Sequence, residues 1–168
     1  VDLTSVSDYT IQEGDVLEYD IYWETPSARI SVDFTTSDNV NLRDRKLIDQ
    51  NGVGVHTGTL YDDYALNKWY HRKIVLPEVL FGKTIDRYDI ACESDEGGTK
   101  TAYLRNIVIT DGNGNIRKVI YMGGEDITYA IHLGHYGSIN AFENTTERLL
   151  DDYGTDVAIY RKENGVIK

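Results

Sequence analysis

Two carboxylates stand two residues apart in the run LEYDIY, at Glu18 and Asp20. On an extended strand, side chains at positions i and i+2 project from the same face, so the two acids lie side by side. A carboxylate pair of this kind can hydrolyse a glycosidic bond, with one group as general acid and the other as nucleophile or base. The next alternate position, where a catalytic strand of this type would carry another acid, is Tyr22. We therefore interpret Glu18 and Asp20 as a structural pair that faces Arg72 or Arg105.

A second group of chemically active side chains lies in the long polar segment Ser37–Leu66. Guanidinium and amide groups can form paired hydrogen bonds to neighbouring hydroxyls. Long ordered loops in compact domains are usually functional, and the tip of this one should lie beside the edge of the strand that follows it. If the loop is not the site, the outward face carrying Tyr22 and Asn106 is the next candidate. The predicted ligand-binding residues are Arg43, Asp44, Asp49, Gln50, Asn51, His56, Tyr70 and Arg72.

The same segment is also a candidate for metal binding, because calcium takes several carboxylate and carbonyl oxygens. We predict a structural Ca²⁺ held by Asp38, Asp44 and Asp49 together with backbone carbonyls of the loop. The turn Asp111–Asn115 resembles the start of an EF-hand loop, but the position of the bidentate acid is Met122, which rules that motif out. A hairpin turn explains it.

Composition restricts the partners. The chain has 168 residues, of which 40% are hydrophobic, enough for one domain with one core. Its formal net charge is −11, so nucleic acid and anionic membrane surfaces would be repelled over most of the molecule. The single cysteine, Cys92, allows no internal disulfide and is interpreted as a small buried hydrophobe. No signal peptide is visible, and the start at Val1 suggests a piece excised from a longer precursor.

Apolar residues alternate with polar ones along most of the chain, which predicts β-strands. The clearest alternation is in Val16–Glu24, and Arg29–Thr36 follows it after a short turn, so we expect these two strands to form a β-hairpin. Helix is expected only near Pro77–Phe81 and at Thr145–Asp152. The other predicted strands are Asp8–Ile11, Lys68–Leu76, Thr84–Glu93, Thr101–Thr110, Ile116–Met122, Thr128–Leu133 and Val157–Arg161.

This pattern predicts an all-β fold, an antiparallel β-sandwich of the jelly-roll type with one or two short helices. We expect a single domain over residues 1–168, with a lead-in at 1–8 and a linker at 162–168. The aromatic residues divide by strand face: Tyr19, Trp23 and Trp69 are assigned to the core. The candidates for an exposed stacking surface are Tyr22, Tyr61, Tyr64, Tyr70 and Tyr136.

Several runs of the sequence resemble one known class of β-sandwich. The run WYHRKIVLP, a turn ending in Gly-Lys, a strand closing on CE, and YLRNIVIT before a Gly/Asn-rich turn are similar to the back half of a carbohydrate-binding module. With GDVLEYDIYW and LRD…DQNG, the resemblance covers roughly residues 9 to 122. Modules of this class are appended to secreted bacterial polysaccharide-degrading enzymes.

The resemblance implies a non-catalytic module that binds a polysaccharide or oligosaccharide, and that targets a catalytic domain in the same parent chain. It also implies that the protein is secreted or held at the cell surface. Two alternatives stay open. The first is an enzyme of the same fold, a glycoside hydrolase or a polysaccharide lyase, and the second is a structural or adhesive spacer domain without a sugar site.

Overall fold

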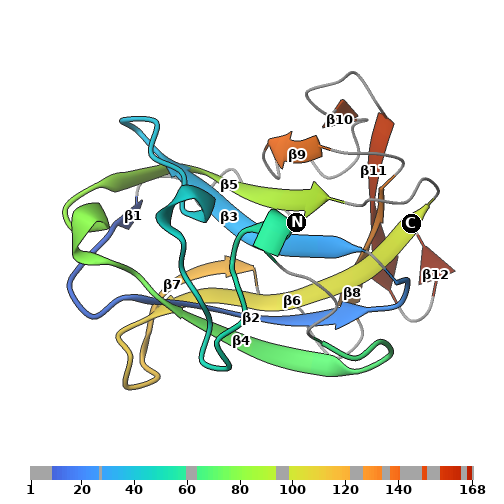
Figure 1. Cartoon of the computed structure of the whole chain (residues 1–168), viewed down its shortest axis with the longest axis horizontal. Coiled ribbons are helices and arrows are strands. Elements are labelled where there is room, and N and C mark those ends of the chain that lie inside the picture. The colour runs from blue at the N-terminus through green and yellow to red at the C-terminus, as the bar shows by residue number, and fades with distance from the viewer. Residues whose placement is uncertain are drawn as a thin grey trace.

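The structure is a computed structural model that describes residues 9–26, 28–59, 64–93, 99–121, 127–133, 137–140, 149–150, 156–163 and 166–167. It is an all-β antiparallel sandwich, as the sequence predicts (Figure 1). The strands are β1 (Tyr9–Thr10), β2 (Val16–Trp23), β3 (Arg29–Thr36), β4 (Trp69–Val75), β5 (Thr84–Glu93), β6 (Lys100–Thr110), β7 (Ile116–Tyr121), β8 (Ile127–Leu133), β9 (Gly137–Asn140), β10 (Leu149–Leu150), β11 (Asp156–Glu163) and β12 (Val166–Ile167).

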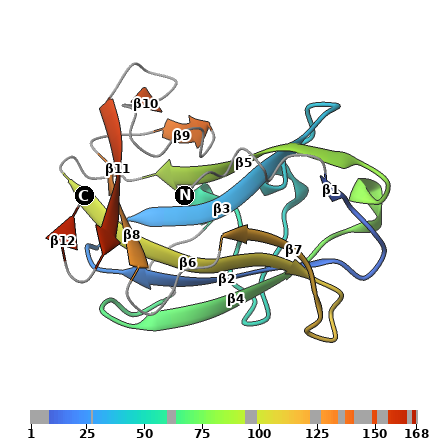
Figure 2. The ribbon, with the colours of Figure 1, turned by 180° about the vertical axis from the view of Figure 1, so that it is seen from behind.

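Two sheets make up the sandwich. In the small sheet β5 pairs with β3 on one edge, while β1 and β9 pair with different parts of β5. The large sheet has the order β10-β11-β8-β6-β2-β4, and β7 also pairs with β6. Figure 2 shows the two layers from behind, with β3 and β5 over β6 and β2.

The expected hairpin of Val16–Glu24 and Arg29–Thr36 is wrong. The first strand, β2, lies in the large sheet between β4 and β6, and the second, β3, pairs with β5 in the small sheet. The short connection after Trp23 therefore crosses from one layer to the other. Alternation tells which face of a strand is buried, but it does not tell which strand is the neighbour.

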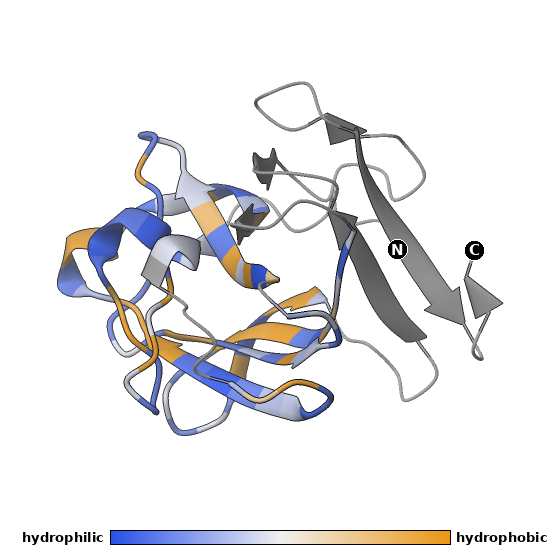
Figure 3. Cartoon of the chain, turned by 45° about the vertical axis from the view of Figure 1, so that its right-hand side comes forward, coloured by the Kyte–Doolittle hydropathy of each residue, from blue (hydrophilic) through white to orange (hydrophobic). Residues whose placement is uncertain are grey.

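Apolar side chains from both sheets meet in one core. Alternating hydrophobic and hydrophilic bands are visible along the strands in Figure 3. Full burial of such side chains contributes about 1.5–3 kcal/mol each to folding, so this core is the main stabilising element. Its fully buried members from β2 and β3 are Leu17, Tyr19, Ile21, Ile30, Val32 and Phe34.

The segment between β3 and β4 runs along the open side of the sandwich, between these two strands of different sheets (Figure 1). The amide of Leu42 donates to the carbonyl of Phe34, and Leu42 and Val55 are buried in the core. This segment contains the short 3₁₀ turns η2 (Arg43–Arg45) and η3 (Thr57–Thr59). It closes the side of the sandwich.

The helix predictions have different outcomes. Near Pro77–Phe81 the structure has a single 3₁₀ turn, η4 (Glu78–Leu80). The predicted helix at Thr145–Asp152 lies mostly outside the described residues, and the two described positions, Leu149 and Leu150, form the strand β10 instead. Within the expected linker 162–168, strand β12 pairs with the end of β11.

A β-bulge interrupts β6. Opposite β2, the register moves from Glu18↔Val108 to Asp20↔Arg105, which leaves one extra residue on β6. Asn106 takes the left-handed conformation there, with φ 51°. Strict alternation predicts Arg105 and Asn106 on opposite faces of the strand; the bulge instead turns both side chains to the same carboxylate, that of Asp20.

Candidate functional site

The outward face of β4, β2 and β6 carries cross-strand rows of side chains, which we call the outer strip. Paired residues in an antiparallel sheet project from the same face, about 4.5–5.5 Å apart. The first row is aromatic, and the second and third rows are mainly charged. In order across the strands the rows are Trp69–Tyr22–Tyr103, His71–Asp20–Arg105 and Lys73–Glu18–Val108.

The aromatic row is a continuous surface. The ring centroid of Tyr22 lies 5.6 Å from that of Trp69 and 5.7 Å from that of Tyr103. The guanidinium carbon of Arg105 lies 4.0 Å from the Trp69 ring centroid, which is a cation–π contact. All three aromatic side chains are half-buried, so part of each ring reaches solvent. The core assignment of Trp69 is therefore wrong, whereas Tyr19 and Trp23 are buried.

Asp20 is the centre of the second row. One of its carboxylate oxygens accepts hydrogen bonds from Arg105 Nε at 3.0 Å and Asn106 Nδ2 at 2.9 Å. The other oxygen lies 2.7 Å from Nδ1 of His71. Burial alone would raise the pKa of Asp20, but the hydrogen bonds from His71, Asn106 and Arg105 outweigh it and hold the pKa below its ordinary value.

Glu18 occupies the third row in a similar way. Its Oε2 lies 2.8 Å from His71 Nε2 and 3.2 Å from Lys73 Nζ, and its Oε1 accepts a bond from the Thr110 hydroxyl at 2.7 Å. Burial opposes ionisation here too, yet the bonds from Thr110, His71 and Lys73 lower the pKa of Glu18. The imidazole of His71 thus bridges the two acids, and both carboxylates are held in the charged form.

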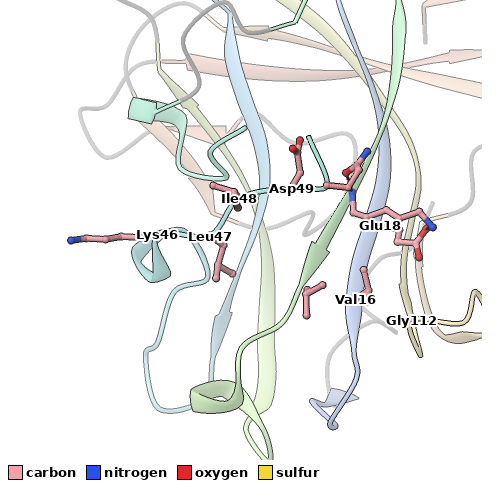
Figure 4. Close-up of a pocket in the computed structure, with 10 residues that line it drawn as sticks. Val16, Glu18, Lys46, Leu47, Ile48, Asp49 and Gly112 are labelled. Atoms are coloured by element: carbon pink, nitrogen blue, oxygen red, sulfur yellow. Dashed lines mark hydrogen bonds and ion pairs between the residues drawn. The ribbon is translucent and has the colours of Figure 1, made fainter. Parts of the chain in front are cut away.

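A pocket of about 570 Å³ adjoins the strip at its Val16–Val75 end (Figure 4). The strands contribute Val16, Glu18, Lys73 and Val75 to its wall, and the loop contributes residues 46–50. Ile48 and Val75 are exposed there. The pocket and the strip are therefore continuous along β2 and β4.

Two of the ligand-binding residues predicted from the sequence, Asp49 and Arg72, lie inside the protein instead of at a surface. Arg72 is fully buried, and its Nε donates to Asp49 Oδ2 at 2.7 Å. Its other nitrogens donate to the hydroxyl of Tyr19 and to the carbonyls of Val53 and Gly54. All of these partners are protein groups. The expected pairing of Arg72 with Glu18 or Asp20 is wrong, while that of Arg105 with Asp20 is confirmed.

Four more predicted residues fix the loop: Gln50 and Tyr70 link it to β4, and Asn51 and His56 form bonds within it. Gln50 bonds the backbone of β4: its amide donates to the carbonyl of His71 at 2.6 Å and accepts from the amide of Lys73 at 2.8 Å. Asn51 Nδ2 donates to the Tyr64 hydroxyl. His56 and Tyr70 accept bonds from the backbone amides of Gly58 and Ala65, respectively.

The other predicted residues lie nearer the small sheet. The backbone amide of Arg43 donates to Asp33 Oδ1 of β3 at 3.0 Å, and Asp44 accepts a long bond from Asn41. Asp38 is paired with Lys83. Among the residues that the structure describes, no group of three or more metal-ligating side chains is found. Calcium binding by Asp38, Asp44 and Asp49 stays a prediction, to be checked by melting the protein with calcium and with a chelator.

Sequence reasoning missed Trp69, Tyr103 and Arg105 as functional candidates. A signal for the bulge that turns Arg105 and Asn106 outward is present in β6. The buried apolar residues Ala102 and Leu104 are in one alternation phase, and Ile107 and Ile109 are in the other. A change of phase inside one strand indicates an inserted residue.

Comparison with known proteins gives no match, either to a protein-family model or to a curated protein. In the described part of the chain, no helix is long and apolar enough to cross a membrane.

Proposed function

We propose that this protein is a non-catalytic carbohydrate-binding module, and that its glycan lies along the outer strip. The observation that carries the proposal is the aromatic row Trp69–Tyr22–Tyr103 beside two charged rows on one open sheet face. Aromatic rings pack against the apolar C–H faces of sugars, and charged and amide groups bond their hydroxyls. In the parent protein, secreted or at the cell surface, the module would direct a catalytic domain to a polysaccharide.

The dimensions of the strip suit a chain of sugars. From Glu18 to Tyr22, β2 advances four residues, or roughly 13 Å at about 3.3 Å per residue, and the adjoining pocket at Val16 extends this length. The strip also lies on strands of the large sheet, where the packed inner faces and the bulge in β6 fix the outward side chains. Binding to a preorganised surface loses less conformational entropy than binding to a mobile one.

A glycoside hydrolase that uses Glu18 and Asp20 is the second candidate, because the two acids share one face. Hydrolysis requires one carboxyl that is protonated near neutral pH. Here the pKa of both acids is lowered, and every carboxylate oxygen accepts a hydrogen bond or faces His71. These contacts favour binding over hydrolysis.

The test is retention of the protein in gels that contain a panel of soluble polysaccharides. We expect Trp69→Ala and Tyr22→Ala to abolish retention. A stacking aromatic contributes about 1–3 kcal/mol to the binding free energy, and a weak complex that loses this contribution is no longer detected. The control is Arg43→Ala, a change at the site predicted from the sequence. We expect the polysaccharide gel to retain this variant as it retains the wild type. Melting temperatures verify that each variant is folded. Loss of retention in Arg43→Ala alone would place the site in the loop, and retention of no polysaccharide would favour the spacer alternative.

A further inference from the structure

The outer strip exposes its nitrogen groups and covers its carboxylates. The side chains of Arg105, His71 and Lys73 are 34%, 45% and 47% exposed, whereas those of Glu18 and Asp20 are 9% and 14% exposed. The carboxylates lie beneath, with their oxygens occupied by His71, Lys73, Arg105, and the neutral donors Thr110 and Asn106. A ligand on the strip therefore meets donor groups first.

Arg105 is held in place by two contacts. Its Nε is fixed by Asp20, and its guanidinium plane is supported by Trp69. Among the described residues, no hydrogen bond engages its two terminal nitrogens. A guanidinium held in this way presents a planar pair of N–H donors, which matches the two oxygens of a carboxylate.

We infer that the ligand of the strip is an acidic polysaccharide, bound through the carboxylate of a uronic acid on Arg105. The inference rests on the proposed function and specifies its substrate class. Lys73, in the third row, is a second cation that an adjacent acidic sugar could reach along the same strand face. The aromatic row would take the apolar faces of the neighbouring rings.

The strip differs in charge from the molecule as a whole. The protein has a formal net charge of −11, but on the strip Arg105 and Lys73 balance Glu18 and Asp20, so the strip lacks the negative excess of the whole molecule. The Debye length at physiological ionic strength is about 8 Å, so a bound sugar responds mainly to the groups beneath it. At the aromatic end of the strip, a further acid, Glu24, accepts a bond from the Tyr103 hydroxyl.

The first experiment compares each acidic polymer with its own neutral form. Polygalacturonate, alginate and hyaluronan are tested against the whole chain before and after chemical reduction of their carboxylates to alcohols. We expect retention by at least one of the acidic polymers, and loss of that retention after reduction. Equal retention by the reduced polymer would overturn the inference while leaving the proposed function in place. Dextran sulfate tests the alternative anion, and equal binding to it would overturn the assignment to a carboxylate.

The second experiment asks whether Arg105 makes the contact. We expect Arg105→Gln to weaken binding of the acidic polymer at least about tenfold, equivalent to about 1.4 kcal/mol, and Arg105→Lys to restore only part of it, since lysine keeps the charge without the planar fork. Arg87→Gln is the matched control: Arg87 is 39% exposed and pairs with Asp89 on the small sheet. If both glutamine variants weaken binding equally, the inference fails.

The same samples separate the inference from the proposed function. Retention by neutral polymers, unaffected by Arg105→Gln, would leave a carbohydrate-binding module without acidic specificity. Release of unsaturated oligosaccharides from a uronate polymer would instead identify a lyase, and the non-catalytic proposal would be wrong.

Discussion

The outer strip and the loop between β3 and β4 are built from the same residue types, yet their side chains point to different environments. In the loop, the Asp49 carboxylate meets a fully buried Arg72, and Tyr64 donates to the same oxygen at 2.5 Å. On the strip, Asp20 meets an Arg105 that is one-third exposed. The comparison teaches that a loop rich in aspartate, arginine and asparagine need not be a binding surface. Its polar side chains can instead form hydrogen bonds to protein groups that hold the loop in place.

The largest expected effect follows from breaking the buried pair. Arg72→Ala should lower the free energy of unfolding by about 3–5 kcal/mol, because it leaves Asp49 buried without its cation and removes the anchor of residues 53 and 54. Urea denaturation measures the difference. Arg105→Gln, the corresponding change on the strip, should cost about 1 kcal/mol or less, as exposed ion pairs do. Similar losses in the two variants would contradict the distinction between the two regions.

The contributions of the two regions to the free energy of unfolding should also depend on pH in opposite directions. Beside the loop, burial raises the pKa of Asp33 to about 6, against the opposing effect of the amides of Arg43 and Phe34. In an unfolded chain aspartate titrates near 4, so the stability linked to Asp33 is present below about pH 4 and lost as the pH rises through about 6. Asp33→Asn should therefore raise the free energy of unfolding at pH 8, by up to roughly 3 kcal/mol, and change little at pH 4.

Asp20 on the strip should show the opposite pH dependence to Asp33, and the same measurement of the free energy of unfolding tests it. Its pKa is lowered in the folded protein, so its contribution to stability is present above about pH 4 and declines as the pH falls. Asp20→Asn should destabilise the protein at pH 7 and approach the wild type at low pH. If the two asparagine variants follow the same pH dependence, the contrast in burial has no energetic consequence.

A further prediction concerns the bulge that shapes the strip. Asn106 has a positive φ, which glycine tolerates and a β-branched residue does not. Asn106→Val should lower stability by about 1–2 kcal/mol, the scale of the left-handed penalty, whereas Asn106→Gly should keep the fold and lose only the bond to Asp20. Thermal melting distinguishes them, and equal melting temperatures would show that the bulge conformation carries no strain.

Much of the fold could be predicted from the sequence, because period-two alternation specifies strands directly. Thr84–Glu93 and Arg29–Thr36 have the predicted bounds. The partners of the strands could not be predicted in the same way. Val16–Trp23 and Arg29–Thr36 both bury apolar side chains in one core, and this pattern is the same whether the strands are neighbours or face each other across the sandwich.

The site was less predictable for a related reason. Charged residues in a loop have no periodicity that reveals which way they point, so Asp49 could not be recognised as buried. Arg72 lies on β4 in the same alternation phase as the buried Ile74, which indicates the inner face, but its partners in the loop could not be inferred from that phase. On β2, by contrast, alternation correctly separates Tyr22 from Tyr19 and Trp23. Trp69 was assigned to the core by residue type, although it pairs with Tyr22 and so shares its outward face.

The amide of Gln50 has a consequence for how the protein behaves among its own copies. β4 ends the order of the large sheet, and an edge strand with open amide and carbonyl groups is a template on which a strand of another chain can add. Gln50 bonds the carbonyl of His71 and the amide of Lys73, as the backbone of an added strand would. A single side chain thus occupies two of the backbone groups that an added strand would need next to the outer strip, which disfavours self-association through that edge.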